Sequence, residues 1–281
     1  MRLDDIRESG NVEDRRGRRL RRGGAAVGGG AVLVAIVLSL LGAPPEVVDQ
    51  VLQGGGGTIE EVEDPSQIDP AQAPTWSRMR RVLTTTEEVW SQLFSSSGQR
   101  YAPPKLIAFT DAVQSACGTA DSAVGPFYCP LDQQIYLDLT FFDELAKKFG
   151  APGDFAQAYV LAHEVGHHVQ TLTGISERVH AQRSRVSKVE GNRLSVLQEL
   201  QADCYAGVWA HHGLAREERL EPGDVEEGLR AANAIGDDTL QRRAQGHVVP
   251  DSFTHGSAAQ RQQWFQRGFD TGRVDACDTF R

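Results

Sequence analysis

An uncharged stretch near the N-terminus divides the chain into two parts. From Gly23 to Pro45 the sequence has no Asp, Glu, Lys or Arg, and its segment AVLVAIVLSLL, residues 31–41, is almost wholly aliphatic. Such a run is typical of a transmembrane helix, because about 20 apolar residues span the hydrocarbon core of a bilayer. Three glycines at residues 28–30 shorten the strictly apolar part, so a cleaved signal peptide is the alternative interpretation. We predict a single transmembrane helix at residues 23–45.

Charged residues on either side of this stretch predict its orientation. The sequence RRGRRLRR, residues 15–22, comes directly before it, and the next Lys or Arg after it is Arg78. Loops rich in Lys and Arg stay in the cytoplasm, so we predict a cytoplasmic, arginine-rich N-terminus at residues 1–22 and export of the chain from about residue 46 onward. The expected location is therefore the cell membrane, with the folded domain on its outer side.

The residues after the apolar stretch predict a linker and then one folded domain. Residues 46–75 combine Pro, Gly and acidic residues with little periodicity, which is the composition of a solvated linker. We expect the domain to begin near Trp76 and to span residues 76–281. The net charge of −9 argues against nucleic acid as a partner, because neutralising phosphates needs clustered Lys and Arg on the folded part.

The four cysteines predict two disulfide bonds if the domain is exported. They are Cys117, Cys129, Cys204 and Cys277, and none lies at C-x-x-C spacing, so neither a zinc ribbon nor a redox pair is present. Disulfides persist in an oxidising compartment, and four cysteines permit three pairings. We favour Cys117 with Cys129, because the short loop between them contains two glycines and a proline. That pairing leaves Cys204 with Cys277.

One short motif has the residue types and the spacing of a metal site. A helix is predicted from Asp154, as its cap, to a stop at Gly174, and it contains the sequence HEVGH. His163 and His167 lie four residues apart and hence on one face, where two imidazoles can bind one Zn²⁺. Glu164 can take a proton from the water that such a metal activates and return it to the leaving amine. The motif therefore predicts zinc-dependent hydrolysis with Glu164 as the catalytic base.

A second predicted helix, within residues 192–213, offers a third ligand. Glu199 and Asp203 lie four residues apart on one face of it. Glu199 can give a carboxylate oxygen to zinc, while Asp203 accepts the N–H of a ligating histidine and orients it. Gly166 in the first helix would let another backbone approach closely. We expect one Zn²⁺ per chain, held by His163, His167 and Glu199.

Other histidines are weaker candidates for the metal. His168 follows His167 directly and points about 100° away on a helix, which favours a packed or surface position. The pattern H-E-x-x-H-x-x-G-x-x-H would need histidine at residue 173, where the chain has Thr173. The remaining rivals lack this spacing: His180, His211, His212, His247 and His255.

Several segments resemble the bacterial putative neutral zinc metallopeptidase family. They are DDIRESGNVEDRRG, the apolar stretch, HEVGHHVQ, ELQADCYAGVW, and the closing FTHGSAAQRQQWFQRGF with ACDTF, so the resemblance spans nearly the whole chain. H-E-x-x-H followed by E-x-x-A-D is also similar to gluzincin-type peptidases, which implies Glu199 as the third ligand. The family is named largely by its motif, so the resemblance implies a peptidase without indicating its substrate.

The order of the predicted elements indicates an α+β fold. Residues 76–94 read as a helix, KLIAFT and QQIYLDL read as strands, and nearly everything after Phe141 reads as helical. Strands followed by helices imply a mostly helical domain with a small β-sheet, which is zincin-like by analogy. By the same analogy, the strand with Ile135, Tyr136 and Leu137 is the sheet edge that pairs with an extended peptide.

Peptide hydrolysis also needs a donor for the oxyanion of the tetrahedral intermediate. Ser257 and Gln260 form a predicted capping box that starts the last helix, which leaves His255 in the loop before it. The candidate oxyanion stabilisers are therefore His255, Arg261 and Tyr205, although each alone is more often a surface or helix-face residue.

We expect a zinc metallopeptidase that hydrolyses peptide or protein substrates at the outer side of the membrane. The alternative is a non-catalytic peptide-binding or scaffolding module with a zincin-like fold. Glu164 favours the enzyme, because a structural zinc site has no use for a base beside an open coordination position.

Overall fold

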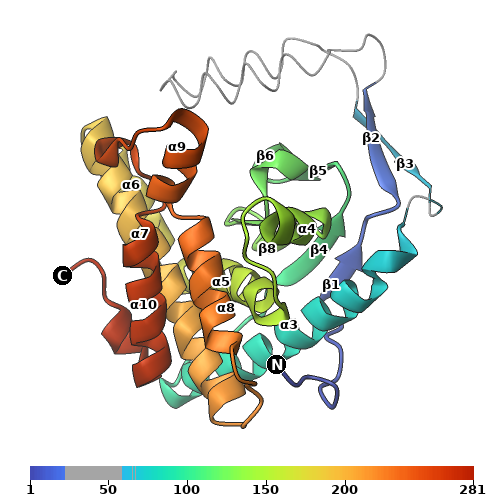
Figure 1. Cartoon of the computed structure of the whole chain (residues 1–281), viewed down its shortest axis with the longest axis horizontal. Coiled ribbons are helices and arrows are strands. Elements are labelled where there is room, and N and C mark those ends of the chain that lie inside the picture. The colour runs from blue at the N-terminus through green and yellow to red at the C-terminus, as the bar shows by residue number, and fades with distance from the viewer. Residues whose placement is uncertain (23–58, 65, 67) are drawn as a thin grey trace.

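The computed structural model describes residues 1–22, 59–64, 66 and 68–281, and it has a small sheet beside a larger group of helices (Figure 1). The main sheet has the strand order β1-β4-β8-β7. Strands β1, β4 and β8 are parallel, and β7 is antiparallel to β8. Their bounds are Val12–Asp14 for β1, Lys105–Phe109 for β4, Phe127–Cys129 for β7 and Gln134–Asp138 for β8.

The two central strands, β4 and β8, are those predicted from KLIAFT and QQIYLDL. Their side chains are almost all buried, as expected for strands covered on both faces. Because β8 lies between β4 and β7, the prediction that Ile135, Tyr136 and Leu137 form a sheet edge is wrong. The edge on that side is β7.

Two further pairs of strands form small antiparallel ribbons. Strand β2 (Arg18–Arg22) pairs with β3 (Ile59–Glu63), and β5 (Ala112–Ser115) pairs with β6 (Gly118–Asp121). The second ribbon lies just before β7 in the chain, and a disulfide between Cys117 and Cys129 ties the two together.

Helices make up most of the chain after β8, as predicted for an α+β domain. The long helices are α3 (Ala73–Ser96), α4 (Thr140–Lys147), α5 (Asp154–Leu172), α6 (Ile175–Arg183), α7 (Lys188–Ala210), α8 (Asp224–Ala234), α9 (Asp237–Gln245) and α10 (Ala258–Thr271). The short ones are η2 (Pro70–Gln72), η3 (Ser122–Val124), the π-turn η4 (His211–Ala215), η5 (Pro250–Ser252) and η6 (Val274–Cys277). The predicted capping box of Ser257 and Gln260 is present at the start of α10.

Helix α5 crosses the core, and most of its residues are buried. It approaches α7 closely at Gly166, where an added Cβ would lie 2.9 Å from the carbonyl oxygen of Ala202. Helices α7 and α10 meet in the same way, because a Cβ on Gly268 would lie 2.0 Å from the carbonyl oxygen of Cys204. Glycine at these two positions therefore sets the spacing of three helices, α5, α7 and α10.

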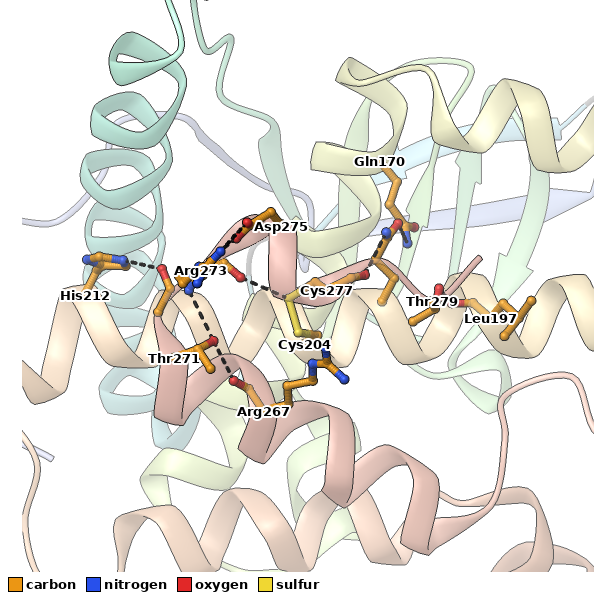
Figure 2. The surroundings of a disulfide bond; sticks show 12 residues. Gln170, Leu197, Cys204, His212, Arg267, Thr271, Arg273, Asp275, Cys277 and Thr279 are labelled. Carbon is orange, nitrogen blue, oxygen red and sulfur yellow. Dashed lines mark hydrogen bonds and ion pairs between the residues drawn. A yellow bond between two sulfur atoms is a disulfide. The ribbon is translucent and has the colours of Figure 1, made fainter. Parts of the chain in front are cut away.

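Both predicted disulfides are present. Cys117 bonds to Cys129, and Cys204 of α7 bonds to Cys277 near the C-terminus. Figure 2 shows the second bond fastening the C-terminal segment along α7, where the Thr279 hydroxyl also donates to the carbonyl oxygen of Leu197 at 2.7 Å. This crosslink lies one residue after Asp203 in α7.

The first 22 residues belong to the folded body, so the prediction that it begins near Trp76 is wrong. Strand β1 joins the main sheet beside β4, and the N-terminal residues lie along α3 (Figure 1). Leu3 is buried in the core, and the Ser9 hydroxyl and the Asn11 amide both donate to Glu87, at 2.6 and 2.8 Å. The pattern was missed because VED has no apolar alternation and its partner strand is remote in sequence.

No helix in the described part of the chain is long and apolar enough to cross a membrane. The predicted transmembrane helix at residues 23–45 lies outside the described residues, as does most of the predicted linker at 46–75.

Candidate metal centre

Helices α5 and α7 bring the three predicted metal ligands together. His163 and His167 lie one turn apart on α5 and face Glu199 of α7. The Nε2 atom of His163 is 3.2 Å from one carboxylate oxygen of Glu199, and that of His167 is 3.4 Å from the other. Two ligands on a tetrahedral zinc with bonds of about 2.0–2.1 Å are roughly 3.3 Å apart. The donor types and their spacing therefore fit Zn²⁺.

The other ring nitrogen of each histidine is occupied. His163 Nδ1 donates to Asp203 Oδ1 at 2.8 Å, as predicted, and His167 Nδ1 donates to Gln170 Oε1 at 2.9 Å. These partners place the proton of each neutral imidazole on Nδ1 and leave the Nε2 lone pair free for a metal.

Asp203 is fully buried and is held by two further side chains. Arg261 of α10 binds both of its oxygens, at 2.9 Å each, and the Tyr159 hydroxyl donates to Oδ1. Burial favours the protonated form, but the Arg261 guanidinium and His163 hold the pKa of Asp203 below its usual value. The carboxylate therefore stays charged and keeps the His163 ring in one orientation.

Negative charge dominates around the two histidines. Burial alone would lower the pKa of His163, but the carboxylates of Asp203 and Glu199 raise it to about 10. The same histidines hold the pKa of Glu199 well below its usual value, against the effect of its burial. The site thus favours a cation between these residues, and a divalent metal ion supplies one.

Glu164 lies beside this site and lines the same cleft. The cleft has a volume of about 460 Å³, and its walls include His163, His167, Glu199 and His255. Burial raises the pKa of Glu164, while the neighbouring histidines lower it. A carboxylate with a raised pKa next to a metal site is well suited to accept and return a proton at neutral pH.

The three candidate oxyanion stabilisers have different surroundings. His255 lines the cleft, and Asp237 fixes it: Nδ1 lies 3.1 Å from Asp237 Oδ1, and the backbone N–H donates to Oδ2 at 2.7 Å. Arg261 is buried and bound to Asp203. Tyr205 packs against Trp90 and lines a different hollow, so the structure does not bring it to the metal site.

The remaining histidines lie outside the ligand set. His168 is buried, as a packed residue, with Nε2 donating to the Ala102 carbonyl at 2.6 Å and Nδ1 lying 3.1 Å from the Tyr128 hydroxyl. His211 and His212 bind carbonyl oxygens near the end of α10. Among the described residues, the cluster of possible metal ligands that contains histidine is His163, His167 and Glu199.

Sequence reasoning missed Gln170, Tyr159 and Asp237. Gln170 joins the site to α7, because its amide nitrogen donates to the Gln198 carbonyl at 2.7 Å and lies 3.1 Å from Gln201 Oε1. Its position three residues after His167, on the same face of α5, was the available signal. Tyr159 precedes His163 by one turn and offered a similar signal, whereas nothing local connects Asp237 with His255.

Comparison with known proteins places the chain in a family. Its sequence matches the putative neutral zinc metallopeptidase family over residues 1–280, so it belongs to that family. It is 48% identical over 225 residues to protein YpfJ of Escherichia coli K12, covering 80% of this chain and 78% of the relative.

A second relative is protein Rv2575 of Mycobacterium tuberculosis H37Rv, which is 42% identical over 222 residues, covering 75% of this chain and 73% of the relative. Neither relative's name states an activity. No solved structure matches the chain significantly.

Proposed function

We propose that this protein is a zinc-dependent peptidase that hydrolyses peptide bonds, with Glu164 as the catalytic base. One observation carries the proposal: the Nε2 atoms of His163 and His167 converge on Glu199, while both Nδ1 atoms are occupied. Zinc, when bound, supplies Lewis-acid chemistry and lowers the pKa of a water to about 7. The family assignment supports this choice of metal and reaction class.

Glu164 has the position and environment that proton transfer requires. It follows His163 directly on α5 and lines the cleft together with Glu199. Its carboxylate accepts the proton of the attacking water and then delivers it to the leaving nitrogen of the peptide. Burial favours this cycle, because it brings the pKa of the carboxyl closer to neutral.

His255 is the best placed of the three candidates for contact with the oxyanion. Asp237 orients its ring and, with nearby Glu199, raises its pKa against the effect of burial, which favours a donating, protonated ring. Arg261 is instead a positioning residue, because its guanidinium acts on His163 through Asp203.

Strand β7 offers an edge along which an extended peptide can bind. The cleft wall runs from residue 122 to residue 128, which includes part of β7, and continues to Phe141 and Phe149. A peptide paired with this edge would present its backbone to Glu164 and its side chains to the apolar wall.

The outer side of the membrane is the location that the disulfides support. Cys204 and Cys277 are both buried, Cys129 is buried and its partner Cys117 is exposed, and disulfide bonds persist in an oxidising compartment.

Hydrolysis of a mixed peptide library by the purified protein tests the proposal. We expect cleavage that a chelator abolishes and that stoichiometric zinc restores, whereas magnesium does not. Cleavage that is insensitive to the chelator, or zinc-loaded protein that cleaves nothing, would contradict it.

A further inference from the structure

A second hollow adjoins the metal centre on the side of α6. It has a volume of about 290 Å³ and shares Tyr128, His167 and Glu199 with the larger cleft, so the two hollows meet at the metal ligands. Its lining also includes His180 and Arg183 of α6. A peptide lying across the metal centre could therefore occupy both hollows.

The two hollows differ in chemistry. The lining of the larger cleft includes the apolar side chains of Phe141, Phe149 and Leu240. The smaller hollow has two basic side chains, His180 and Arg183, which are three residues apart on one face of α6 and exposed to solvent.

Within the described part of the chain, the two basic side chains of the smaller hollow have no ion-pair partner. Among the described residues, neither His180 nor Arg183 forms an ion pair with a carboxylate, and Glu190 at the start of α7 pairs with Arg193 instead. The stem of Arg183 passes Gly191 of α7, where an added Cβ would lie 4.0 Å from its Cγ. Arg183 thus lines the hollow with a side chain that is exposed to solvent.

We propose that this hollow is a subsite for an acidic side chain of the peptide substrate, on one side of the bond that is cleaved. The proposal rests on the proposed peptidase function. Arg183 supplies a two-pronged donor that matches a carboxylate, and His180 adds a second donor beside it.

Cleavage-site profiling of a peptide library with the zinc-loaded full chain tests this subsite. We expect acidic residues to be enriched at one position on one side of the cleaved bond. Arg183→Glu should lower kcat/KM for such peptides by about fivefold or more, because attraction becomes repulsion, and 0.5 M salt should shrink the difference. Arg178→Glu is the matched control, since Arg178 lies on the same helix but lines another hollow.

The outcomes separate the two proposals. Cleavage without an acidic preference, or equal effects of Arg183→Glu and Arg178→Glu, would overturn the subsite and leave the peptidase intact. Absence of any cleavage by zinc-loaded protein would instead overturn the peptidase itself.

An independent observation concerns the side of the membrane on which the N-terminus lies. Strands β2 and β3 pair in register, with Arg22 opposite Ile59, so the chain leaves the described structure after Arg22 and returns beside it. Paired strands lie only about 5 Å apart, whereas a single crossing separates its two ends by the roughly 30 Å of the hydrocarbon core.

We infer that residues 1–22 lie on the same side of the membrane as the metal centre. This replaces the predicted cytoplasmic N-terminus. The arginine-rich sequence also has a role inside the fold: Arg15 binds Glu13 at 2.8 Å, Arg16 binds Asp14 at 2.6 Å, and β2 lies opposite the acidic sequence IEEVE of β3.

Labelling of single introduced cysteines in cells tests whether residues 1–22 and the metal centre lie on the same side of the membrane. Gly10→Cys and Ser184→Cys place thiols at exposed positions of the N-terminal segment and of the helical part, and a Cβ at Gly10 meets no atom within 4 Å. With a membrane-impermeant maleimide we expect both variants to be labelled before permeabilisation. Labelling of one variant before and the other only after permeabilisation would overturn the inference. If both variants were labelled only after permeabilisation, the two segments would still lie on the same side of the membrane, but export of the domain would be contradicted.

Discussion

At the residue scale, the metal centre depends on which nitrogen of each histidine is free. Asp203 and Gln170 each accept a hydrogen bond from Nδ1–H, and both residues are themselves buried and bound by other side chains or backbone groups. Fixed partners of this kind orient ligands before the metal arrives, which raises affinity without adding a ligand.

Gln170→Leu tests this orienting role. The change removes the acceptor for His167 Nδ1 and the bond to the Gln198 carbonyl, so zinc affinity should fall by about 10 to 100-fold. Competition with a chromophoric chelator measures the affinity. Gln198→Leu is the control, because the Gln198 side chain binds Ser176 instead of a histidine, and its affinity should stay within about threefold of the parent. Equal losses in both variants would show that Gln170 has no special role.

The residues that could be predicted from the sequence are those joined by local spacing. His163, Glu164 and His167 follow from one helical turn, and Glu199 with Asp203 from another. Gln170 was missed although it lies only three residues after His167. Its orienting role depends on hydrogen bonds to Gln198 and Gln201 in a different helix. The pairing of Asp237 with His255 bridges two elements, and helical periodicity holds no information about such contacts.

At the element scale, the distance between α5 and α7 sets the geometry of the ligands. Gly166 permits that distance, as the sequence suggested, because a side chain there would meet the backbone of Ala202. The helices themselves were predictable from apolar periodicity, and the disulfides from a short loop and elimination. The edge strand of the sheet was not predictable from the sequence, because strand order depends on which segments pair across the fold.

Gly166→Ala compared with Gly191→Ala tests the close approach. Both glycines lie in helices, where alanine is favoured by about 1 kcal/mol. At Gly166 the methyl group would force α5 and α7 apart, so we expect a net loss of about 1–3 kcal/mol in the free energy of unfolding and weaker zinc binding. Gly191 has space for it, so Gly191→Ala should be neutral or stabilising in urea unfolding. A stable, zinc-binding Gly166→Ala protein would show that the helices can separate without cost.

At the scale of the whole molecule, the chain folds as a body that includes both of its ends. The N-terminal residues complete the sheet, and the C-terminal segment is fixed to α7 by the Cys204–Cys277 bond. Composition could not predict the pairing of β1 with β4. A polar strand of three residues has no pattern that identifies it until its parallel neighbour is known. A charge rule predicts a topology signal from the adjacent arginines, and two of them, Arg15 and Arg16, also pair with acidic residues in the fold.

Replacing residues 23–58 with a short Gly-rich turn tests this organisation. Arg22 and Ile59 are paired, so a turn of a few residues should close the ribbon, and the variant should fold and bind about one zinc. Deleting residues 1–58 should instead expose the edge of β4 and leave Glu87 without Ser9 and Asn11, which should give an unstable or aggregated protein. Circular dichroism and zinc content compare the two. Equal stability would mean that the N-terminal segment is dispensable.

The most direct test of the whole account is Glu164→Gln, with zinc content and peptide hydrolysis measured on the same sample. Because the change removes the base and leaves His163, His167 and Glu199 in place, we expect about one zinc per chain, as in the parent, and a loss of at least 100-fold in kcat. Hydrolysis at the parent rate with zinc bound would contradict the assignment of Glu164 as the base. Loss of zinc would contradict the separation of base and ligands on which the proposed mechanism depends.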